Sequence, residues 1–104
     1  MIYAIIWAHF FGDFILQSDW MAKNKSDNLT ALVLHGLSYG VPLIYFGWEF
    51  ACVNMGWHMA VDAVTSKITK QLWLAEKRHW FFVIIGADQA IHLTVLIATM
   101  GLIR

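Results

Sequence analysis

Hydrophobic residues along the chain gather in four long segments, which shorter polar connections separate. A helix needs about 17 or more apolar residues to cross a membrane, and the first segment is close to that lower limit. The other three segments exceed it. The pattern therefore predicts an all-α protein, a bundle of four transmembrane helices forming a single domain over residues 1–104, with helices at about 2–17, 29–47, 50–69 and 80–103.

The second segment carries signals for its start and its packing. Asp27 or Asn28 is a suitable N-cap, because a short polar side chain accepts hydrogen bonds from the free N–H groups of a first helical turn. Gly36 and Gly40 lie four residues apart and allow close approach of a neighbouring helix. Pro42 lacks a backbone donor, so a kink is expected there.

Polar residues interrupt the third segment at spacings of three and four. Residues with this spacing share one face of a helix, and in a membrane such a face points to protein rather than to lipid. The stripe consists of Asn54, His58, Asp62, Thr65, Ser66 and Thr69. A shorter stripe on the fourth segment consists of Asp88, His92 and Thr99.

Histidine and aspartate occur four residues apart in three of the segments. The pairs are His9 with Asp13, His58 with Asp62, and Asp88 with His92. The members of each pair point the same way, because residues four apart share a helix face. Ionisable groups in such apolar segments need partners, since an unpaired buried charge is costly.

The composition supports a membrane protein. Hydrophobic residues make up 60% of the chain and charged residues 13%, whereas soluble domains contain about 25% charged residues. The lipid bilayer is therefore the expected partner, and a net charge of zero argues against nucleic acid. The single Cys52 excludes an internal disulfide and a cysteine metal site.

Basic residues predict the orientation. Six of the seven lysines and arginines lie in or beside the two longer connections, and Arg104 is the seventh. Because cytoplasmic loops are enriched in such residues, we expect a multi-pass inner (plasma) membrane protein with both termini outside the cytoplasm. Each pair then has its Asp on the cytoplasmic side and its His one turn deeper, with His35 at a similar depth. Four His and three Asp should therefore converge in the cytoplasmic half of the bundle.

Such a cluster has the side chains of a metal site. Neutral imidazoles and carboxylates bind zinc, manganese or iron, and one or two divalent cations relieve the repulsion among three carboxylates. The candidate ligands are His9, Asp13, His35, His58, Asp62, Asp88 and His92, the candidate catalytic residues are His9, Asp13, His58 and Asp62, and the neighbouring polar candidates are Gln17 and Gln89. Without the cation, Asp62→Asn should be neutral or stabilising, because it removes one of the repelling carboxylates.

Three functions remain open for this cluster. The favoured one is a divalent-metal-dependent membrane hydrolase, in which the three Asp bind metal with His9, His58 or His92 and a remaining His or Asp acts as general base. The second is an ion, proton or metal transporter, although the chain lacks the pair of broken helices that transporters use. The third is an accessory membrane subunit with a structural polar network. Besides the bilayer, the expected partner is a second copy of the chain, in a homo-oligomer, or another protein of a membrane complex.

Several motifs resemble those of a known family. They are AHFFGDFILQSDWMAKNKS, LVLHGL, HMAVDAVTSKIT and DQAIHL, in this order. Over nearly its whole length the chain resembles the domain of unknown function 3307 family, a bacterial and phage family of small polytopic membrane proteins. The resemblance implies a membrane protein with the same helical plan and implies no activity. The family's recurrent polar positions correspond to His9, Asp13, Gln17, His35, His58, Asp62, Asp88, Gln89 and His92.

Overall fold

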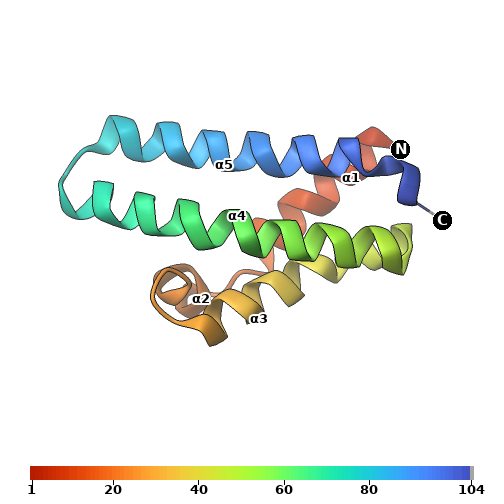
Figure 1. Cartoon of the computed structure of the whole chain (residues 1–104), viewed down its shortest axis with the longest axis horizontal. Helices are drawn as coiled ribbons and strands as arrows, with labels where there is room; N and C mark the ends of the chain where they lie inside the picture. The colour runs from red at the N-terminus through yellow and green to blue at the C-terminus, as the bar shows by residue number, and fades with distance from the viewer. Residues whose placement is uncertain (104) are drawn as a thin grey trace.

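The computed structural model of the chain describes residues 1–103, and this part consists of helices and their connections, without strands. The predicted all-α class is therefore confirmed. Helices α4 (Trp48–Leu74) and α5 (Arg78–Ala98) form a long antiparallel hairpin, along which the other elements pack (Figure 1). These are α1 (Ile2–Phe10), the π-helical turn η1 (Phe11–Ile15), α2 (Asp19–Asn24), α3 (Leu29–Gly40), and the 3₁₀ helices η2 (Pro42–Phe46) and η3 (Met100–Leu102).

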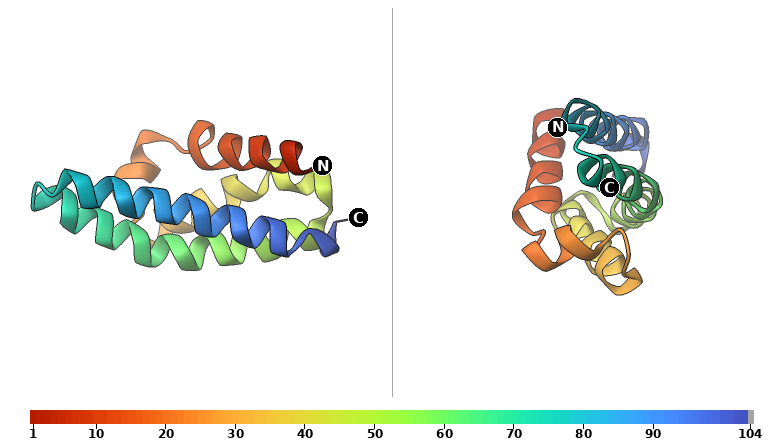
Figure 2. Two further views of the ribbon diagram at one scale, coloured as in Figure 1. Left: turned by 90° about the horizontal axis from the view of Figure 1, so that it is seen from above. Right: turned by 90° about the vertical axis from the view of Figure 1, so that its left-hand side faces the viewer.

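The two ends of the molecule differ in charge. Figure 2 shows both chain termini at one end, near the connection from η2 to α4, and the α4–α5 turn at the other end. The six basic residues of the described chain lie toward the α4–α5 turn: Lys23 and Lys25 in and just after α2, Lys67 and Lys70 near the end of α4, and Lys77 and Arg78 at the start of α5. Arg104 lies outside the described residues.

Local sequence signals explain where α3 begins and ends. Asn28 caps the helix, because its side chain accepts a hydrogen bond from the Ala31 N–H at 3.1 Å. The predicted cap at this position is therefore confirmed. The helix ends at Gly40, and Pro42 starts the 3₁₀ helix η2. Gly47, with a φ of 112°, then makes the turn into α4, a conformation that glycine adopts without strain.

Two glycines allow α3 and α4 to pack closely. A Cβ placed on Gly36 would lie 2.4 Å from two atoms of the Met59 side chain, and a Cβ on Gly40 would lie 2.2 Å from Met55 Sδ. Both methionines belong to α4. The predicted close approach of a helix at these glycines is confirmed.

The helix boundaries differ from the predicted segments at the polar connections. The first connection contains α2, and the second is limited to residues 75–77, because α4 and α5 both extend beyond the hydrophobic pattern. Contacts across the hairpin favour this extension: the rings of Trp73 and Phe81 pack with centroids 5.0 Å apart, and the Arg78 guanidinium lies over the Trp73 ring. Polar residues at a helix end do not stop the helix when such contacts continue.

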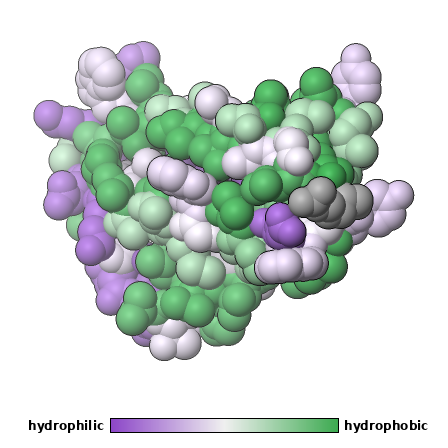
Figure 3. Space-filling view, turned by 45° about the vertical axis from the view of Figure 1, so that its right-hand side comes forward, coloured by the Kyte–Doolittle hydropathy of each residue, from purple (hydrophilic) through white to green (hydrophobic). Residues whose placement is uncertain are grey.

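Polar side chains lie inside the bundle and large hydrophobic side chains cover much of its surface. Buried polar residues include His35, His58 and Asp62, whereas Trp7 and Trp48 expose 69% and 70% of their surface. Hydrophobic residues cover most of the face in Figure 3, and hydrophilic residues gather mainly along its left edge. Hydrophobic residues such as Phe50 and Leu96 are buried as well, so the feature that water disfavours is the number of large hydrophobic side chains on the surface.

Two segments of the described chain are long and apolar enough to cross a membrane, Leu29–Phe46 and Arg78–Ala98. Ile2–Ile15 is apolar but shorter. Two of the four predicted spans are thus long and apolar enough to cross a membrane. Core helices of soluble proteins pass the same test of length and composition.

Candidate functional site

The seven predicted metal ligands all lie inside the bundle. They are His9 from α1, Asp13 from η1, His35 from α3, His58 and Asp62 from α4, and Asp88 and His92 from α5. None of them exposes more than 8% of its surface. The structure therefore brings side chains from five elements into one buried cluster.

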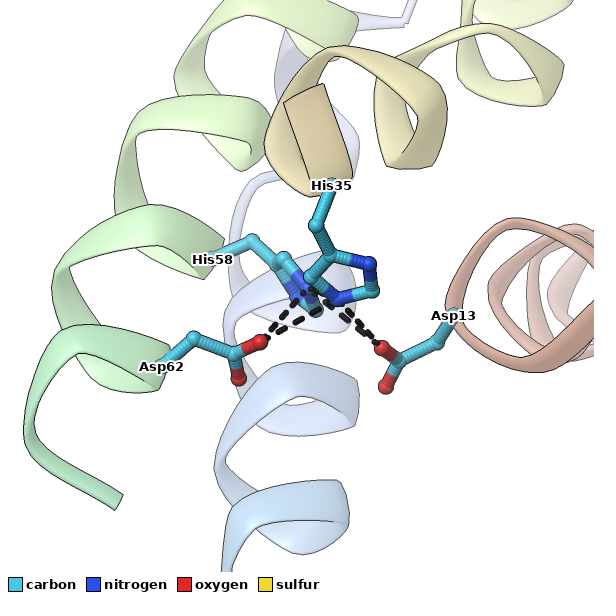
Figure 4. Close-up of side chains that lie close together, drawn as sticks. All are labelled: Asp13, His35, His58 and Asp62. Carbon is cyan, nitrogen blue, oxygen red and sulfur yellow. Dashed lines mark hydrogen bonds and ion pairs between the residues drawn. The ribbon is translucent and has the colours of Figure 1, made fainter. Parts of the chain in front are cut away.

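Four of these residues form a compact unit, called here the four-ligand group: Asp13, His35, His58 and Asp62. The Nε2 atoms of His35 and His58 lie 2.8 Å apart. His35 Nε2 is 3.0 Å from Asp13 Oδ1 and 3.1 Å from Asp62 Oδ2. His58 Nε2 is 3.4 Å from each of the same two oxygens. Figure 4 shows both imidazoles pointing into the space between the two carboxylates.

These distances suit a tetrahedral cation site. Ligand atoms about 2.0–2.1 Å from a tetrahedral zinc ion lie about 3.3 Å from one another. The five N–N and N–O distances given above span 2.8 to 3.4 Å. Small side-chain shifts would place all four atoms around one cation, and imidazole with carboxylate suits zinc, manganese and iron.

A second group shares one carboxylate with the first. Asp13, Asp88 and His92 each offer a ligand atom, and these atoms lie within 4.8 Å of one another. His92 Nε2 lies 3.1 Å from Asp88 Oδ2 and 3.1 Å from Asp62 Oδ1. The carboxylates of Asp13 and Asp62 therefore lie between the two groups, and the donor atoms suffice for one or two cations.

Atoms without hydrogen-bond partners bear on how well a cation fits. Asp13 Oδ2 is buried and has no donor among the described residues, so this carboxylate oxygen has capacity for a cation. The Nδ1 atoms of His35 and His58 are also buried without a partner in the described chain. Most metal-binding histidines donate a hydrogen bond from the second ring nitrogen. The atoms facing the centre thus fit a cation, while the outer nitrogens lack the usual support.

His9 belongs to neither ligand group. Its Nδ1 lies 2.8 Å from the Tyr39 hydroxyl and its Nε2 2.7 Å from Gln89 Oε1, so both ring nitrogens have hydrogen-bond partners. Its distance to Asp13 Oδ2 is 3.8 Å. The reason is η1: the predicted helix over residues 2–17 is not a regular α-helix, and the wider π-helical turn rotates Asp13 relative to His9. His9 therefore contacts Tyr39 and Gln89 rather than the atoms at the centre of the four-ligand group.

The two predicted glutamines lie beside the cluster and differ in their hydrogen bonds. Gln89 accepts a hydrogen bond from His9 and donates one to Asp88 Oδ2 at 3.2 Å, so it links α1 to the Asp88 carboxylate on α5. Gln17 has its Oε1 buried without a partner in the described part of the chain. Thr65, from the predicted polar stripe, donates to Asp88 Oδ1 at 2.6 Å.

Two residues join the cluster that the sequence pattern did not single out as site residues. Lys25 donates from Nζ to Asp62 Oδ2 at 3.0 Å. The Tyr39 ring stacks on His58 with centroids 3.8 Å apart and planes 9° from parallel. Tyr39 lies four residues after His35 and so shares its helix face, which is a signal that could have identified it. For Lys25 the signal was the presence of three buried carboxylates, because buried carboxylates need a positively charged side chain or ion nearby.

A cavity of about 510 Å³ opens beside the cluster, among η1, α2, α4 and α5. Three of the cluster's carboxylates line it, from Asp13, Asp62 and Asp88. Its volume falls within the range of about 300–1,000 Å³ that is usual for small-molecule sites. A ligand in this cavity would therefore reach the carboxylates directly.

The fold and site define a class of all-helical proteins with a buried His and Asp cluster beside a cavity. The sequence matches the family described as "Protein of unknown function (DUF3307)" over residues 1–103, and the chain belongs to this family. The resemblance seen in the motifs is thus confirmed. Neither the curated proteins nor the solved structures contain a match to the chain.

Proposed function

We propose that this protein is a four-span membrane hydrolase that uses a divalent cation held by the four-ligand group. The observation that carries the proposal is the convergence of two imidazoles and two carboxylates at tetrahedral spacing, next to a cavity. Ionisable groups inside a membrane protein are costly, so they mark functional sites by default. The same geometry makes a cation the simplest way to hold these like-charged carboxylates together.

The surface supports the membrane part of the proposal. Tyr3, Trp7, Tyr45 and Trp48 each expose more than two thirds of their surface, with values from 69% to 86%. A hydrophobic exterior around a polar interior is stable in lipid and unfavourable in water. The shorter segment Ile2–Ile15 can be accommodated where the bilayer is locally thin.

The basic end supports an orientation in the inner membrane. With the α4–α5 turn in the cytoplasm, the six described basic residues follow the positive-inside rule, and both termini are outside. In a Cys52→Ser background, a cysteine at Lys77 is expected to resist a membrane-impermeant thiol reagent in intact cells. It should react once the cells are permeabilised.

A cysteine at Tyr3, at the other end of the bundle, is the matched position and should react in intact cells. A reporter fused after Arg104 should likewise be active only outside the cytoplasm. The reverse labelling pattern would invert the proposed orientation, and labelling of both positions in intact cells would exclude a membrane barrier between them.

The bound cation and the residues around the cavity would each perform a different part of the hydrolysis. When bound, a divalent cation polarises the bond to be cleaved and makes water more acidic. Asp88 is held at the cavity wall by its hydrogen bonds from Thr65 and Gln89. Its carboxylate is thus in place to accept a proton from the attacking water. The ring of Tyr39, stacked on His58, fixes the orientation of one imidazole ligand.

Protein purified in detergent without chelator is expected to contain at least one equivalent of zinc, manganese or iron. His58→Ala should lose most of this metal, because it removes one of two imidazole ligands. Elemental mass spectrometry gives the metal content, and its stoichiometry distinguishes one cation from two. Chelator-sensitive hydrolysis of lipid esters in the same preparations tests the activity.

His79→Ala is the matched control for the metal measurement. His79 is exposed at the start of α5, where its ring contacts Trp80 rather than the cluster. This variant should keep the wild-type metal content. If both alanine variants kept the wild-type metal content, the metal would be bound elsewhere. If the wild-type protein contained no metal, the cation site would be refuted.

A further inference from the structure

Three lysines line the same cavity as the carboxylates: Lys23, Lys25 and Lys70. Lys25 is bonded to Asp62, and Lys70 is paired with the exposed Asp27. A divalent cation bound by Asp62 would bring positive charge next to the Lys25 ammonium and weaken its attraction to that carboxylate. The ammonium then becomes available to a ligand in the cavity.

The charges around the loaded cavity leave an excess of positive charge. The three carboxylates that line it face two uncommitted ammonium groups, those of Lys23 and Lys25, because Lys70 is already paired with Asp27. A divalent cation would therefore leave one positive charge uncompensated. A cleft with this balance of charge attracts an anion. Among anions that undergo hydrolysis, a phosphate ester provides several oxygens that can contact a divalent cation and lysine ammonium groups together.

One part of the remaining wall of the cavity is apolar. It is formed by Phe14, Trp73, Phe81 and Ile85. Phe14 and Trp73 each expose 48% of their surface, so the apolar wall continues onto the outside of the bundle. A hydrocarbon chain attached to the anionic group can therefore leave the cavity along these side chains, where lipid surrounds the protein.

We propose that this cavity binds a lipid whose head group is a phosphate ester, and that the site hydrolyses the ester. The inference rests on the proposed function, because the bound cation supplies the uncompensated charge. It adds the substrate class. In the proposed orientation, the cavity lies toward the basic end of the bundle and so on the side of the cytoplasmic leaflet.

The reaction adds water across one P–O bond. The water oxygen bonds to phosphorus, and the bond between phosphorus and the leaving oxygen breaks. Asp88 takes one proton from the water and returns it to the leaving oxygen, which departs as an alcohol. The second water hydrogen stays on the phosphate product, so no oxidant or reductant takes part.

The test uses full-length protein in mixed micelles of a neutral detergent, with phosphatidic acid and phosphatidylglycerol as the phosphate monoester and diester probes. Chelator-sensitive cleavage of either lipid is expected, and glycerol phosphate, which lacks the hydrocarbon chains, should be cleaved much more slowly. Lys23→Gln with Lys70→Gln should lower kcat/KM for the lipid about tenfold, mainly through KM, because two charge-assisted contacts are lost.

The matched control is Lys67→Gln with Lys77→Gln, which removes the same charge from exposed lysines that do not line this cavity. It should leave kcat/KM unchanged. Equal loss in both double variants, or equal rates for glycerol phosphate and lipid, would overturn the inference. If the protein had a normal metal content but cleaved only lipids with carboxylic esters, the inference about phosphate esters would also be overturned. The proposed hydrolase function would stand in that case. Absence of bound metal would instead refute the proposed function itself.

Discussion

Chelation of divalent cations is expected to lower the Tm of the wild-type protein in detergent, and Asp62→Asn is expected to abolish this shift. A cation that binds only the folded state stabilises it by about 2.7 kcal/mol when present at about 100 times its Kd. Asp62 supplies Oδ2 to the four-ligand group, and its Oδ1 lies 3.1 Å from His92. An amide at this position removes an anionic ligand. Thermal unfolding with and without chelator measures the shift.

Asp27→Asn is the matched control for the chelation experiment. Asp27 is exposed and pairs with Lys70 outside the cluster, so this variant should keep the chelator-dependent shift. If chelation leaves the wild-type Tm unchanged at neutral pH, the cluster is a structural network that clamps the helices. In that network, Lys25 provides the positive charge that a metal would otherwise supply.

The structure changes the expected effect of Asp62→Asn in cation-free protein. Repulsion among three carboxylates predicted a neutral or stabilising effect, but Lys25 donates to Asp62 and its side chain is only 18% exposed. Asparagine would leave this ammonium without its anionic partner, which costs about 1–3 kcal/mol. We therefore expect the cation-free variant to be destabilised, so only the chelator-dependent part of its stability reports on the metal.

Gly12→Ala is expected to destabilise the protein by about 1–3 kcal/mol and to lower its metal content. A Cβ at residue 12 would lie 2.9 Å from the carbonyl oxygen of Tyr39 and 3.1 Å from its Cα. These are backbone atoms, which cannot rotate away as a flexible side chain does. The turn η1 must move instead, and Asp13 moves with it, away from His35 at 3.0 Å.

Gly86→Ala provides the contrast for Gly12→Ala. Nothing lies within 4 Å of a Cβ at residue 86, and the position is inside α5. Alanine there should stabilise the helix by up to about 1 kcal/mol and leave metal binding intact. Thermal unfolding and metal analysis of both variants test the pair. Wild-type stability and metal content in Gly12→Ala would show that η1 can shift without disturbing the site.

Hydrophobic and polar spacing along single helices determined much of what the structure shows. The stripe on α4 is an example, because Asn54, His58, Asp62 and Ser66 repeat every four residues and all four are buried. Helical periodicity also placed Asp88 and His92 on one face of α5, and Gly36 and Gly40 against α4. Such signals are visible in sequence because they depend on residues one turn apart in the same element.

Only the tertiary structure decided how the cluster divides. Whether His9 or His35 faces Asp13 depends on the π-helical turn, which no hydrophobic pattern marks. Lys25 reaches Asp62 because α2 folds back from a connection toward α4, and this contact depends on packing between elements far apart in the chain. Periodicity gives the face on which a side chain lies. The neighbour that it meets across the bundle follows from how the helices pack, and so from the whole fold.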